Sequence, residues 1–320
     1  MAWEIVGRWF HACALLACVL VAKLHQGEFH IDEALVRRLL VSQMPQWAEL
    51  PLRLVEPVGT DNVMIRLGDA LAVRLPRIEA AAAAIIKEQQ LVPRIAPHLP
   101  VAVPVPVGVG VPGQGYPWPW SVYRWVVGRN PEPGEADLRL AGELADFVRA
   151  LRGVDTFGLT AEGPLHSYRA DPIQLRDAVT RACIDDCAGL LDTVGVVRAW
   201  EQARRVAEFT GPPVWMHADL HPGNLLVRDG HLAAVLDWGG PALGDPAPDC
   251  LVAWTLLNPQ TRPTFRVRVD VDEDTWRRGR AWALSIALVA LPYYAHTNTQ
   301  ITAWARYAIR QVVEDVVITG

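Results

Sequence analysis

The chain has 320 residues, of which 51% are hydrophobic and 20% are charged, and its formal net charge is −5. This length can hold two units that each have a hydrophobic core, and the composition is that of an ordinary globular protein. The small negative charge argues against a nucleic-acid-binding protein, because such proteins usually carry a basic surface.

The first 28 residues stand apart from the rest of the chain. Residues 10–22 are mostly apolar, but a stretch of this length is too short for a comfortable membrane span. No clear cleavage site of a signal peptide follows it. We therefore expect residues 1–28 to be an N-terminal extension without stable membrane insertion. The five cysteines include no Cys-x-x-Cys pair, which favours a reduced compartment and predicts a cytoplasmic location.

Residues 29–127 have the pattern of a small unit rich in β-strands. A helix is expected after Asp32, because Asp is a good N-cap and apolar residues follow it at helical spacing. A second helix is expected at residues 80–91, where alanines are frequent. Four short apolar segments predict strands, namely residues 54–58, 63–66, 71–75 and 121–125.

Residues 128–320 are mainly helical by their apolar periodicity. The clearest helix covers residues 138–151, whose apolar side chains form one stripe. The acidic run that includes Asp272 is expected to cap a helix near Thr275, because acidic side chains are favoured at helix N-termini. Further helices are expected at residues 171–187, 196–209, 249–257, 275–291 and 299–317.

One segment of this second unit concentrates polar side chains that carry chemistry. A short buried strand is expected at residues 214–216, and the next residues read His-Ala-Asp-Leu-His-Pro-Gly-Asn. This spacing places Asp219 five residues before Asn224. Pro222 and Gly223 between them exclude a helix and allow a tight backbone turn. Asp219 is therefore expected on a loop, where it can orient and deprotonate a hydroxyl group.

A predicted hairpin follows this loop and ends at a second acidic residue. Residues 225–227 and 231–236 are expected to be strands, and Asp229-Gly230 between them favours a turn with positive φ at both positions. Folding the hairpin brings Asp237 back beside Asn224. A carboxylate and an amide at one end of a ribbon suit Mg²⁺, which keeps waters and nucleotide phosphates as its other ligands.

Two other interpretations fit parts of this segment. Asp219 and Asn224 could cap turns while Asp237 ends a strand, but the occurrence of all three in this order disfavours that interpretation. The alternation of His217, Asp219 and His221 also fits a zinc site. That site would leave Asn224, Asp237 and the hairpin without a role, so His217 is expected to support the loop through hydrogen bonds.

These motifs resemble those of the aminoglycoside phosphotransferase family, which are small-molecule kinases with a protein-kinase-like fold. The resemblance runs from about Ile31 to the C-terminus. It also rests on the stretches at residues 59–62, 72–77, 116–120 and 244–247. It implies an α+β fold of two lobes: a β-rich N-lobe at residues 29–127 that binds nucleotide, and a larger, mainly helical C-lobe at residues 128–320 with the catalytic loop, the metal site and the acceptor-binding helices.

The resemblance also implies roles for individual residues. Asp219 is the expected catalytic residue, and Asn224 and Asp237 are the expected Mg²⁺ ligands. Arg74 occupies the position where kinases have a phosphate-binding lysine, and Glu88 is expected to hold it in place. The other expected nucleotide contacts are Gly59 and Asn62 at the phosphates, and Trp125 and Val126 at the adenine.

The sequence thus predicts an enzyme that moves the γ-phosphoryl group of ATP or GTP to a hydroxyl group of a small molecule, with an aminoglycoside-type antibiotic as the expected acceptor. A macrolide, a sugar, an amino alcohol or a metabolite is an alternative acceptor. A nucleotide-binding pseudokinase and a His/Asp metal hydrolase are less favoured alternatives. A cationic acceptor requires an acidic pocket on the C-lobe, for which Asp155, Asp185 and Asp186 are candidates.

Overall fold

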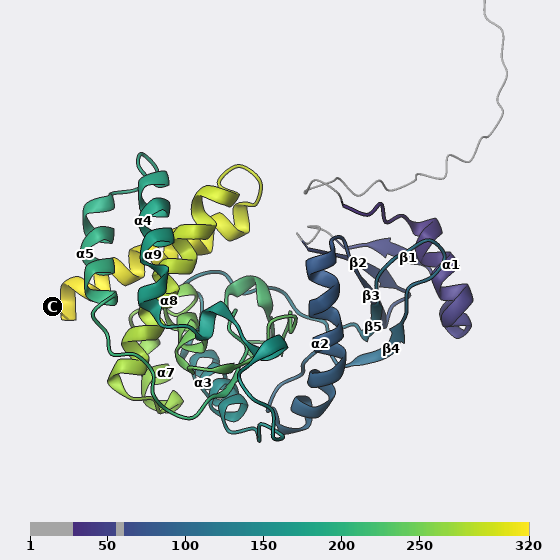
Figure 1. Cartoon of the computed structure of the whole chain (residues 1–320), viewed down its shortest axis with the longest axis horizontal. Coiled ribbons are helices and arrows are strands. Elements are labelled where there is room, and N and C mark those ends of the chain that lie inside the picture. The colour runs from purple at the N-terminus through teal and green to yellow at the C-terminus, as the bar shows by residue number, and fades with distance from the viewer. Residues whose placement is uncertain (1–27, 56–60, 320) are drawn as a thin grey trace, which may run out of the picture.

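The computed structural model describes residues 28–55 and 61–319 and confirms the predicted α+β fold of two lobes. In Figure 1 the strands β1 to β5 and helix α1 form one lobe, and helices α3 to α9 form the other. Helix α2 lies between them. The predicted division after residue 127 falls in the linker between β5 and α3 and stays a prediction. The predicted N-terminal extension lies outside the described residues, apart from its last residue.

The N-lobe is built on an antiparallel sheet with the strand order β1-β2-β3-β5-β4. Side chains of β2 alternate between buried and half-buried, as expected for a strand with one face on a core. Helix α1 (Glu33–Gln43) covers that core, and Asp32 caps it by accepting a hydrogen bond from the Leu35 amide at 2.7 Å. The strands are β1 (Leu52–Leu54), β2 (Asn62–Leu67), β3 (Leu71–Pro76), β4 (Pro106–Gly110) and β5 (Trp120–Arg124).

Helix α2 (Glu79–Ile95) links the two lobes. It carries Glu88 toward β3 and β5, and its last turn, with Val92 and Ile95, is buried in the core of the C-lobe. This burial explains why the helix continues beyond the predicted residue 91, since packing of its apolar face decides where it ends. The helix therefore connects the N-lobe sheet to the core of the C-lobe.

The C-lobe is mainly helical and surrounds one large core that contains several buried tryptophans. Two small sheets lie at the lobe's boundary with the N-lobe: β6 (Val214–Met216) pairs with β9 (Ala242–Gly244), and β7 (Leu225–Arg228) pairs with β8 (His231–Val235). The helices are α3 (Leu138–Arg152), α4 (Asp177–Asp186), α5 (Thr193–Ala203), α6 (Val252–Thr255), α7 (Arg262–Val269), α8 (Glu273–Tyr294) and α9 (Thr299–Thr319). Asp272 caps α8 as predicted.

Several predicted element boundaries are wrong. The helix expected from residue 171 begins only at Asp177, because Pro172 is extended and a 3-10 turn (Ile173–Arg176) follows it. The helix expected at residues 249–257 is a 3-10 turn (Ala247–Leu251) and the short α6, since two prolines lie at its start. Helix α5 starts early because Asp192 caps it, and it ends at Ala203 instead of residue 209.

Two further differences concern what the pattern could not indicate. Helix α7 was not expected, because only Phe265 and Val269 provide buried apolar side chains in an arginine-rich segment. The strand expected at residues 54–58 appears as β1, which ends at Leu54, and residues 56–60 with Gly59 lie outside the described residues. No helix in the described part of the chain has the length and apolarity needed to cross a membrane.

Candidate active site

The loop between β6 and the β7–β8 hairpin is held by buried polar contacts. The carboxylate of Asp249 accepts hydrogen bonds from the backbone amides of His217 at 2.9 Å and Ala218 at 2.6 Å. These bonds from Asp249 hold the loop in place. They also stabilise the positive φ of Ala218 (68°), a backbone conformation that a residue other than glycine seldom adopts. The loop therefore has a defined shape before any ligand binds.

The ring of His217 uses both nitrogens within this loop. Nε2 lies 2.8 Å from the Leu236 carbonyl oxygen, and the Asp219 amide donates to Nδ1 at 3.3 Å. This pattern corresponds to a neutral imidazole with its proton on Nε2. His217 thus supports the loop, as predicted, and has no nitrogen left for a zinc ion. No group of three His, Cys, Asp or Glu within residues 28–55 and 61–319 is arranged as a metal site.

The β7–β8 hairpin brings the expected metal ligands to one place. Asp229 and Gly230 have positive φ, as the predicted turn requires. At the other end of the hairpin, the Leu236 amide donates to the Asn224 carbonyl oxygen at 2.8 Å. Asp237 directly follows Leu236, so the hairpin returns its backbone to the neighbourhood of Asn224, as the sequence predicts.

Asn224 is oriented by its contacts with Asp219. Its amide nitrogen donates to the backbone oxygen of Asp219 at 3.0 Å and to the carboxylate Oδ2 at 3.2 Å. The Asn224 Oδ1 atom forms no hydrogen bond with the described residues. Because the side chain is 8% exposed, this oxygen is a fixed acceptor rather than one that rotates freely in water.

Asp237 faces the N-lobe and joins an ion-pair chain. It has positive φ (59°), and its side chain is half-exposed. Arg74 Nη2 donates to Asp237 Oδ1 at 2.8 Å, and Arg74 Nη1 donates to Glu88 Oε2 at 2.6 Å. The Tyr123 hydroxyl bonds the other oxygen of Glu88. The predicted contact between Arg74 and Glu88 is confirmed, and this series of contacts links the N-lobe to the C-lobe.

The buried end of this chain is Glu88. Burial raises its pKa, although the charge of Arg74 and the Tyr123 hydroxyl act in the opposite direction. Glu88 is fully buried, and Arg74 is nearly so. A buried pair of this kind loses much stability when one partner is removed, because the other charge is left uncompensated. Arg74 is therefore positioned firmly at the edge of the cleft.

Asp219 has a partner that the sequence analysis missed. Arg169 Nη1 donates to Asp219 Oδ1 at 2.6 Å and also bonds the Ala218 carbonyl oxygen. Burial acts to raise the pKa of the Asp219 carboxyl, but the neighbouring charges and hydrogen bonds, chiefly those of Arg169, together outweigh it and hold this pKa well below its usual range. The carboxylate stays ionised at neutral pH. No spacing rule connects Arg169, in a 3-10 turn (Tyr168–Ala170), with a loop so much later in the chain.

His221 and Trp304 form a second contact that the sequence did not indicate. The two rings are stacked, with centroids 4.9 Å apart and planes 13° from parallel. His221 Nδ1 also accepts from the Gly223 amide at 3.1 Å, and burial lowers the pKa of its ring. Helix α9, which carries Trp304, therefore supports the catalytic loop from the C-lobe side.

The remaining predicted nucleotide contacts lie on the N-lobe, apart from this cluster. The Trp125 amide donates to the Ala70 carbonyl oxygen at 2.8 Å, and the Arg66 guanidinium lies 4.1 Å from the ring centroid of Trp125. Val126 follows and is half-buried. Asn62 begins β2, and its buried Oδ1 has no hydrogen-bond partner among the described residues. None of these three residues forms a hydrogen bond or ion pair with Arg74 or Asp237 in the described structure.

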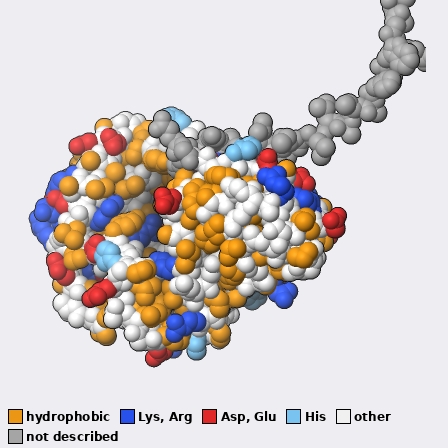
Figure 2. All heavy atoms as spheres, turned by 45° about the vertical axis from the view of Figure 1, so that its right-hand side comes forward, with side chains coloured by type: hydrophobic (Ala, Val, Ile, Leu, Met, Phe, Trp, Pro, Cys, Tyr) orange, Lys and Arg blue, Asp and Glu red, His pale blue; other side chains and the backbone are white. Residues whose placement is uncertain are grey.

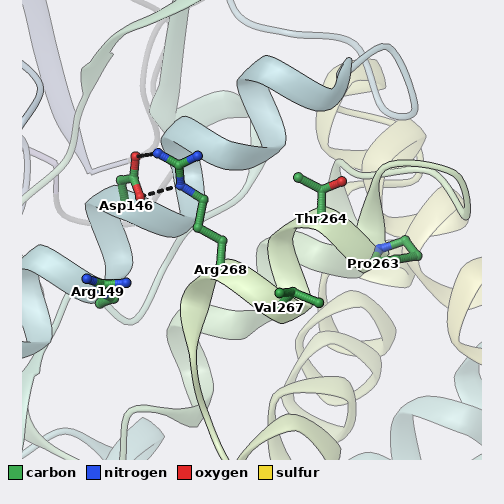
Figure 3. A pocket seen from close by; sticks show the side chains of 6 residues that line it. All are labelled: Asp146, Arg149, Pro263, Thr264, Val267 and Arg268. Atoms are coloured by element: carbon green, nitrogen blue, oxygen red, sulfur yellow. Dashed lines mark hydrogen bonds and ion pairs between the residues drawn. The ribbon is translucent and has the colours of Figure 1, made fainter.

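A surface pocket of about 760 Å³ lies elsewhere, between α3 and α7. Figure 3 shows the ion pair between Asp146 of α3 and Arg268 of α7 beside it. The pocket includes none of the predicted site residues. We therefore identify the candidate active site by its converging polar groups rather than by this hollow.

Comparison with known proteins shows a family match and a similarity of fold. A family model described as the phosphotransferase enzyme family matches residues 55–282. Three solved structures illustrate the fold similarity. APH(2")-IIIa in complex with GDP and kanamycin is 20% identical, with a TM-score of 0.66 over 89% of this chain and 99% of that chain. APH(2'')-Ib with bound ADP is 13% identical, with a TM-score of 0.58 over 89% and 99%. Macrolide 2'-phosphotransferase MphH from Brachybacterium faecium is 21% identical, with a TM-score of 0.54 over 81% and 93%. A search of curated proteins finds no match.

Proposed function

The chain belongs to the phosphotransferase enzyme family, and from that premise we propose that it transfers the γ-phosphoryl group of ATP or GTP to a hydroxyl group of a small molecule. One observation carries the proposal. Asp219 and Asn224 are hydrogen-bonded to each other, and the hairpin brings Asp237 to the same place, beside Arg74. Phosphoryl transfer depends on such positioned charges more than on covalent chemistry.

The nucleotide would bind on the N-lobe side of this cluster. We assign phosphate contact to Arg74, held by Glu88, because a guanidinium binds phosphate oxygens in a bidentate manner. Gly59 and Asn62 would lie at the phosphates, and Trp125 and Val126 at the base. Support comes from the structural neighbours, which were crystallised with GDP or ADP. Their names leave the choice between ATP and GTP open for this chain.

The donor set fits Mg²⁺. One ligand is the half-exposed carboxylate of Asp237, whose Oδ2 forms no hydrogen bond in the described part of the chain, and the other is the Asn224 Oδ1. Both are hard oxygen ligands, and Mg²⁺ commonly takes only one or two from the protein. When bound, the ion supplies positive charge to the phosphate oxygens.

Asp219 would orient the acceptor. Its ionised carboxylate can accept a hydrogen bond from the attacking hydroxyl group, which aligns the oxygen with the γ-phosphorus. As the new phosphate ester bond forms and the bond to the nucleoside diphosphate breaks, the hydroxyl proton passes to Asp219. Because the pKa of this carboxyl is held low, the residue is a weak base, and orientation is its larger contribution.

The proposal extends to the identity of the acceptor and the cellular location of the enzyme. An aminoglycoside acceptor, with a role in antibiotic resistance, is the expectation from family resemblance. The structural neighbours include macrolide as well as aminoglycoside phosphotransferases. We therefore define the proposed acceptor by its hydroxyl group. We also propose that the enzyme acts in the cytoplasm, where ATP and GTP are abundant, and that it does not bind nucleic acid.

Substitution of Asp219 tests the proposed chemistry. Asp219→Asn should lower nucleotide turnover by about 10²-fold or more, because the acceptor hydroxyl group loses the carboxylate that orients it and takes its proton, while nucleotide still binds. A matched control is Asp229→Asn, which makes the same change on the exposed hairpin turn, where Asn tolerates positive φ. A coupled assay of nucleoside diphosphate release, with water or a panel of hydroxylated antibiotics as acceptor, measures both. Equal loss in the two variants would contradict the assigned role.

Removal of the metal tests the other half of the site. Asp237→Ala and chelation of Mg²⁺ by EDTA should each weaken the binding of an ATP analogue, measured by calorimetry. Chelation should have little further effect on Asp237→Ala, because the variant has already lost the stronger ligand. An unchanged affinity in both experiments would show that Asp237 does not bind a metal–nucleotide complex.

A further inference from the structure

Two guanidinium groups lie near the ring of Tyr168, and one of them, that of Arg169, contacts the proposed catalytic residue Asp219. The centre of the Arg169 guanidinium is 5.6 Å from the Tyr168 ring centroid, and that of Arg176 is 5.1 Å from it. The ring packs against Trp282 of α8, with centroids 6.2 Å apart, yet Tyr168 remains 48% exposed. A flat aromatic surface near two positive charges thus opens beside Asp219. We call Tyr168, Arg169 and Arg176 the arginine cluster.

Arg169 has a donor to spare. Its Nε donates to the Tyr168 hydroxyl at 3.0 Å, and its Nη1 bonds Asp219 and the Ala218 carbonyl. Its Nη2 forms no hydrogen bond with any described residue. A guanidinium presents five N–H donors in a rigid fork. Because this fork is fixed by Asp219, the unused donors have a fixed direction as well.

The positive charge of Arg176 is not paired with a carboxylate of the described residues. Its one hydrogen bond within the described structure is a long one, from Nε to the Ser285 hydroxyl at 3.5 Å. It forms no ion pair with the described carboxylates. Arg181, on the next turn of the same segment, pairs instead with Asp177 at 3.0 Å and with Glu201. The absence of a partner is therefore particular to Arg176 and not general to the arginines of this region.

Helices α8 and α9 supply little negative charge near Arg176, and Asp177, the next residue in the chain, pairs with Arg181 and Arg204. No Asp or Glu occurs between Asp274 and Glu314, a stretch that includes most of α8 and α9. Asp171 is paired with His166 at 2.8 Å. Figure 2 shows the molecule hollowed between its two lobes, with Lys and Arg side chains and an acidic side chain at the hollow.

The acidic residues proposed for a cationic acceptor form contacts elsewhere or lie on α4. Asp155 Oδ1 accepts from the Phe157 backbone amide, and Asp185 and Asp186 lie at the C-terminal end of α4. None of the three forms a hydrogen bond or ion pair with Asp219 or with the arginine cluster in the described structure. The two guanidinium groups of the arginine cluster thus favour a negatively charged acceptor.

We propose that the acceptor carries an oxyanion group, a carboxylate or a phosphate, which binds between Arg176 and the free Nη2 of Arg169 over the Tyr168 ring. Charge-assisted, bidentate hydrogen bonds of this type are strong and directional. They hold one end of the acceptor while its hydroxyl group reaches Asp219. The inference rests on the proposed phosphotransferase function and names its substrate class. It departs from an aminoglycoside, whose ammonium groups would meet the two guanidinium charges.

Binding of inorganic phosphate tests the site directly. A non-hydrolysable ATP analogue with Mg²⁺ first occupies the nucleotide site, and calorimetry then measures the phosphate affinity. Arg176→Gln should weaken phosphate binding by about tenfold or more, the usual size of a charge-assisted hydrogen bond, and Arg176→Lys should weaken it less. The matched control is Arg198→Gln, the same loss of charge on an exposed part of α5, which should leave the affinity unchanged. Equal phosphate affinity in wild type and Arg176→Gln would overturn the proposal.

Turnover of matched sugars distinguishes the two anionic sources. Glucuronate, glucose 6-phosphate, glucose and glucosamine differ in charge on one scaffold, and kanamycin adds a polycation. We expect a higher kcat/KM for one of the two anions than for glucose or glucosamine, and Arg176→Gln should raise KM for that anion with little change in kcat. Preference for glucuronate indicates a carboxylate, and preference for glucose 6-phosphate a phosphate. A higher kcat/KM for kanamycin than for both anions would overturn the proposal.

Failure of this inference can be separated from failure of the proposed function. If the wild-type protein binds neither ATP nor GTP, the proposed function is wrong whatever the result with phosphate. If it binds nucleotide but fails to bind phosphate, the kinase assignment stands and the oxyanion site is wrong. If Arg169 contacts only the transferred phosphoryl group, Arg176→Gln will leave both phosphate affinity and KM unchanged, which also overturns the site.

Discussion

The two sides of the cleft use the same kind of contact in different ways. On the N-lobe side, Arg74 binds Asp237 and also the fully buried Glu88. On the C-lobe side, Arg169 binds Asp219, and no second carboxylate contacts it in the described structure. Arg74 would therefore keep Glu88 as a partner if Asp237 binds a metal ion, as we propose. Arg169 depends on Asp219 alone, so its remaining donors are available to a ligand.

Removal of Arg169 or Arg74 should have the largest effect and should separate the roles of the two arginines. We expect Arg169→Met to lower kcat by about 10²-fold or more, because Asp219 loses the group that orients it, while the nucleotide affinity stays close to wild type. Arg74→Met should instead weaken nucleotide binding. Steady-state kinetics together with calorimetric titration of an ATP analogue separates the two effects. The same pattern in both variants would mean that the two pairs are not functionally distinct.

The buried acid on the N-lobe side should matter for stability. Glu88→Ala leaves the Arg74 charge without its buried partner and should reduce the free energy of unfolding by about 3–5 kcal/mol. The control is Glu33→Ala, which removes the solvent-exposed partner of Arg37 and should change that free energy by less than about 1 kcal/mol. Urea denaturation measures both. Similar effects would show that burial of the Arg74 pair adds nothing.

The C-lobe side relies on Asp249 instead of a buried ion pair. Asp249→Asn keeps the side-chain shape but directs an amide group at one of the two backbone amides of the loop, and an unsatisfied buried group costs about 1–3 kcal/mol. We expect a matching loss of unfolding free energy together with reduced kcat, since the loop positions Asp219. Retention of wild-type kcat would indicate that the loop keeps its shape without this carboxylate.

The smallest effect concerns the stack of Trp304 on His221. Trp304→Leu keeps an apolar side chain but removes the aromatic contact, which contributes about 0.5–1.5 kcal/mol beyond the buried area. A modest decrease in Tm and in kcat is expected, with nucleotide affinity unchanged. Thermal unfolding and kinetics check it. A larger loss than for Asp249→Asn would mean that α9, and not the Asp249 carboxylate, is the main support of the loop.

The sequence determined the parts of the site whose geometry is local. Asp219, Asn224 and Asp237 are joined by a short loop and one hairpin, and the Asp229-Gly230 turn begins the pairing that returns Asp237 to Asn224. A register shift between Leu226 and Val227, which the sequence did not indicate, completes this pairing. The contact between Arg74 and Glu88 was likewise predicted, from the resemblance to kinases. Roles in nucleotide binding for Asn62, Trp125 and Val126 stay predictions, and Gly59 lies outside the described residues.

Only the tertiary structure decided which distant side chains complete the site. Arg169 lies before α4 and Trp304 lies on α9, and no periodicity or spacing links either to the catalytic loop. Their positions depend on how helices pack around the C-lobe core, which also moved the ends of α2 and α5 from the predicted residues. Turn chemistry and helix capping act between chain neighbours and are therefore visible in a sequence, whereas packing and long-range hydrogen bonds join residues far apart and appear only when the whole chain has folded.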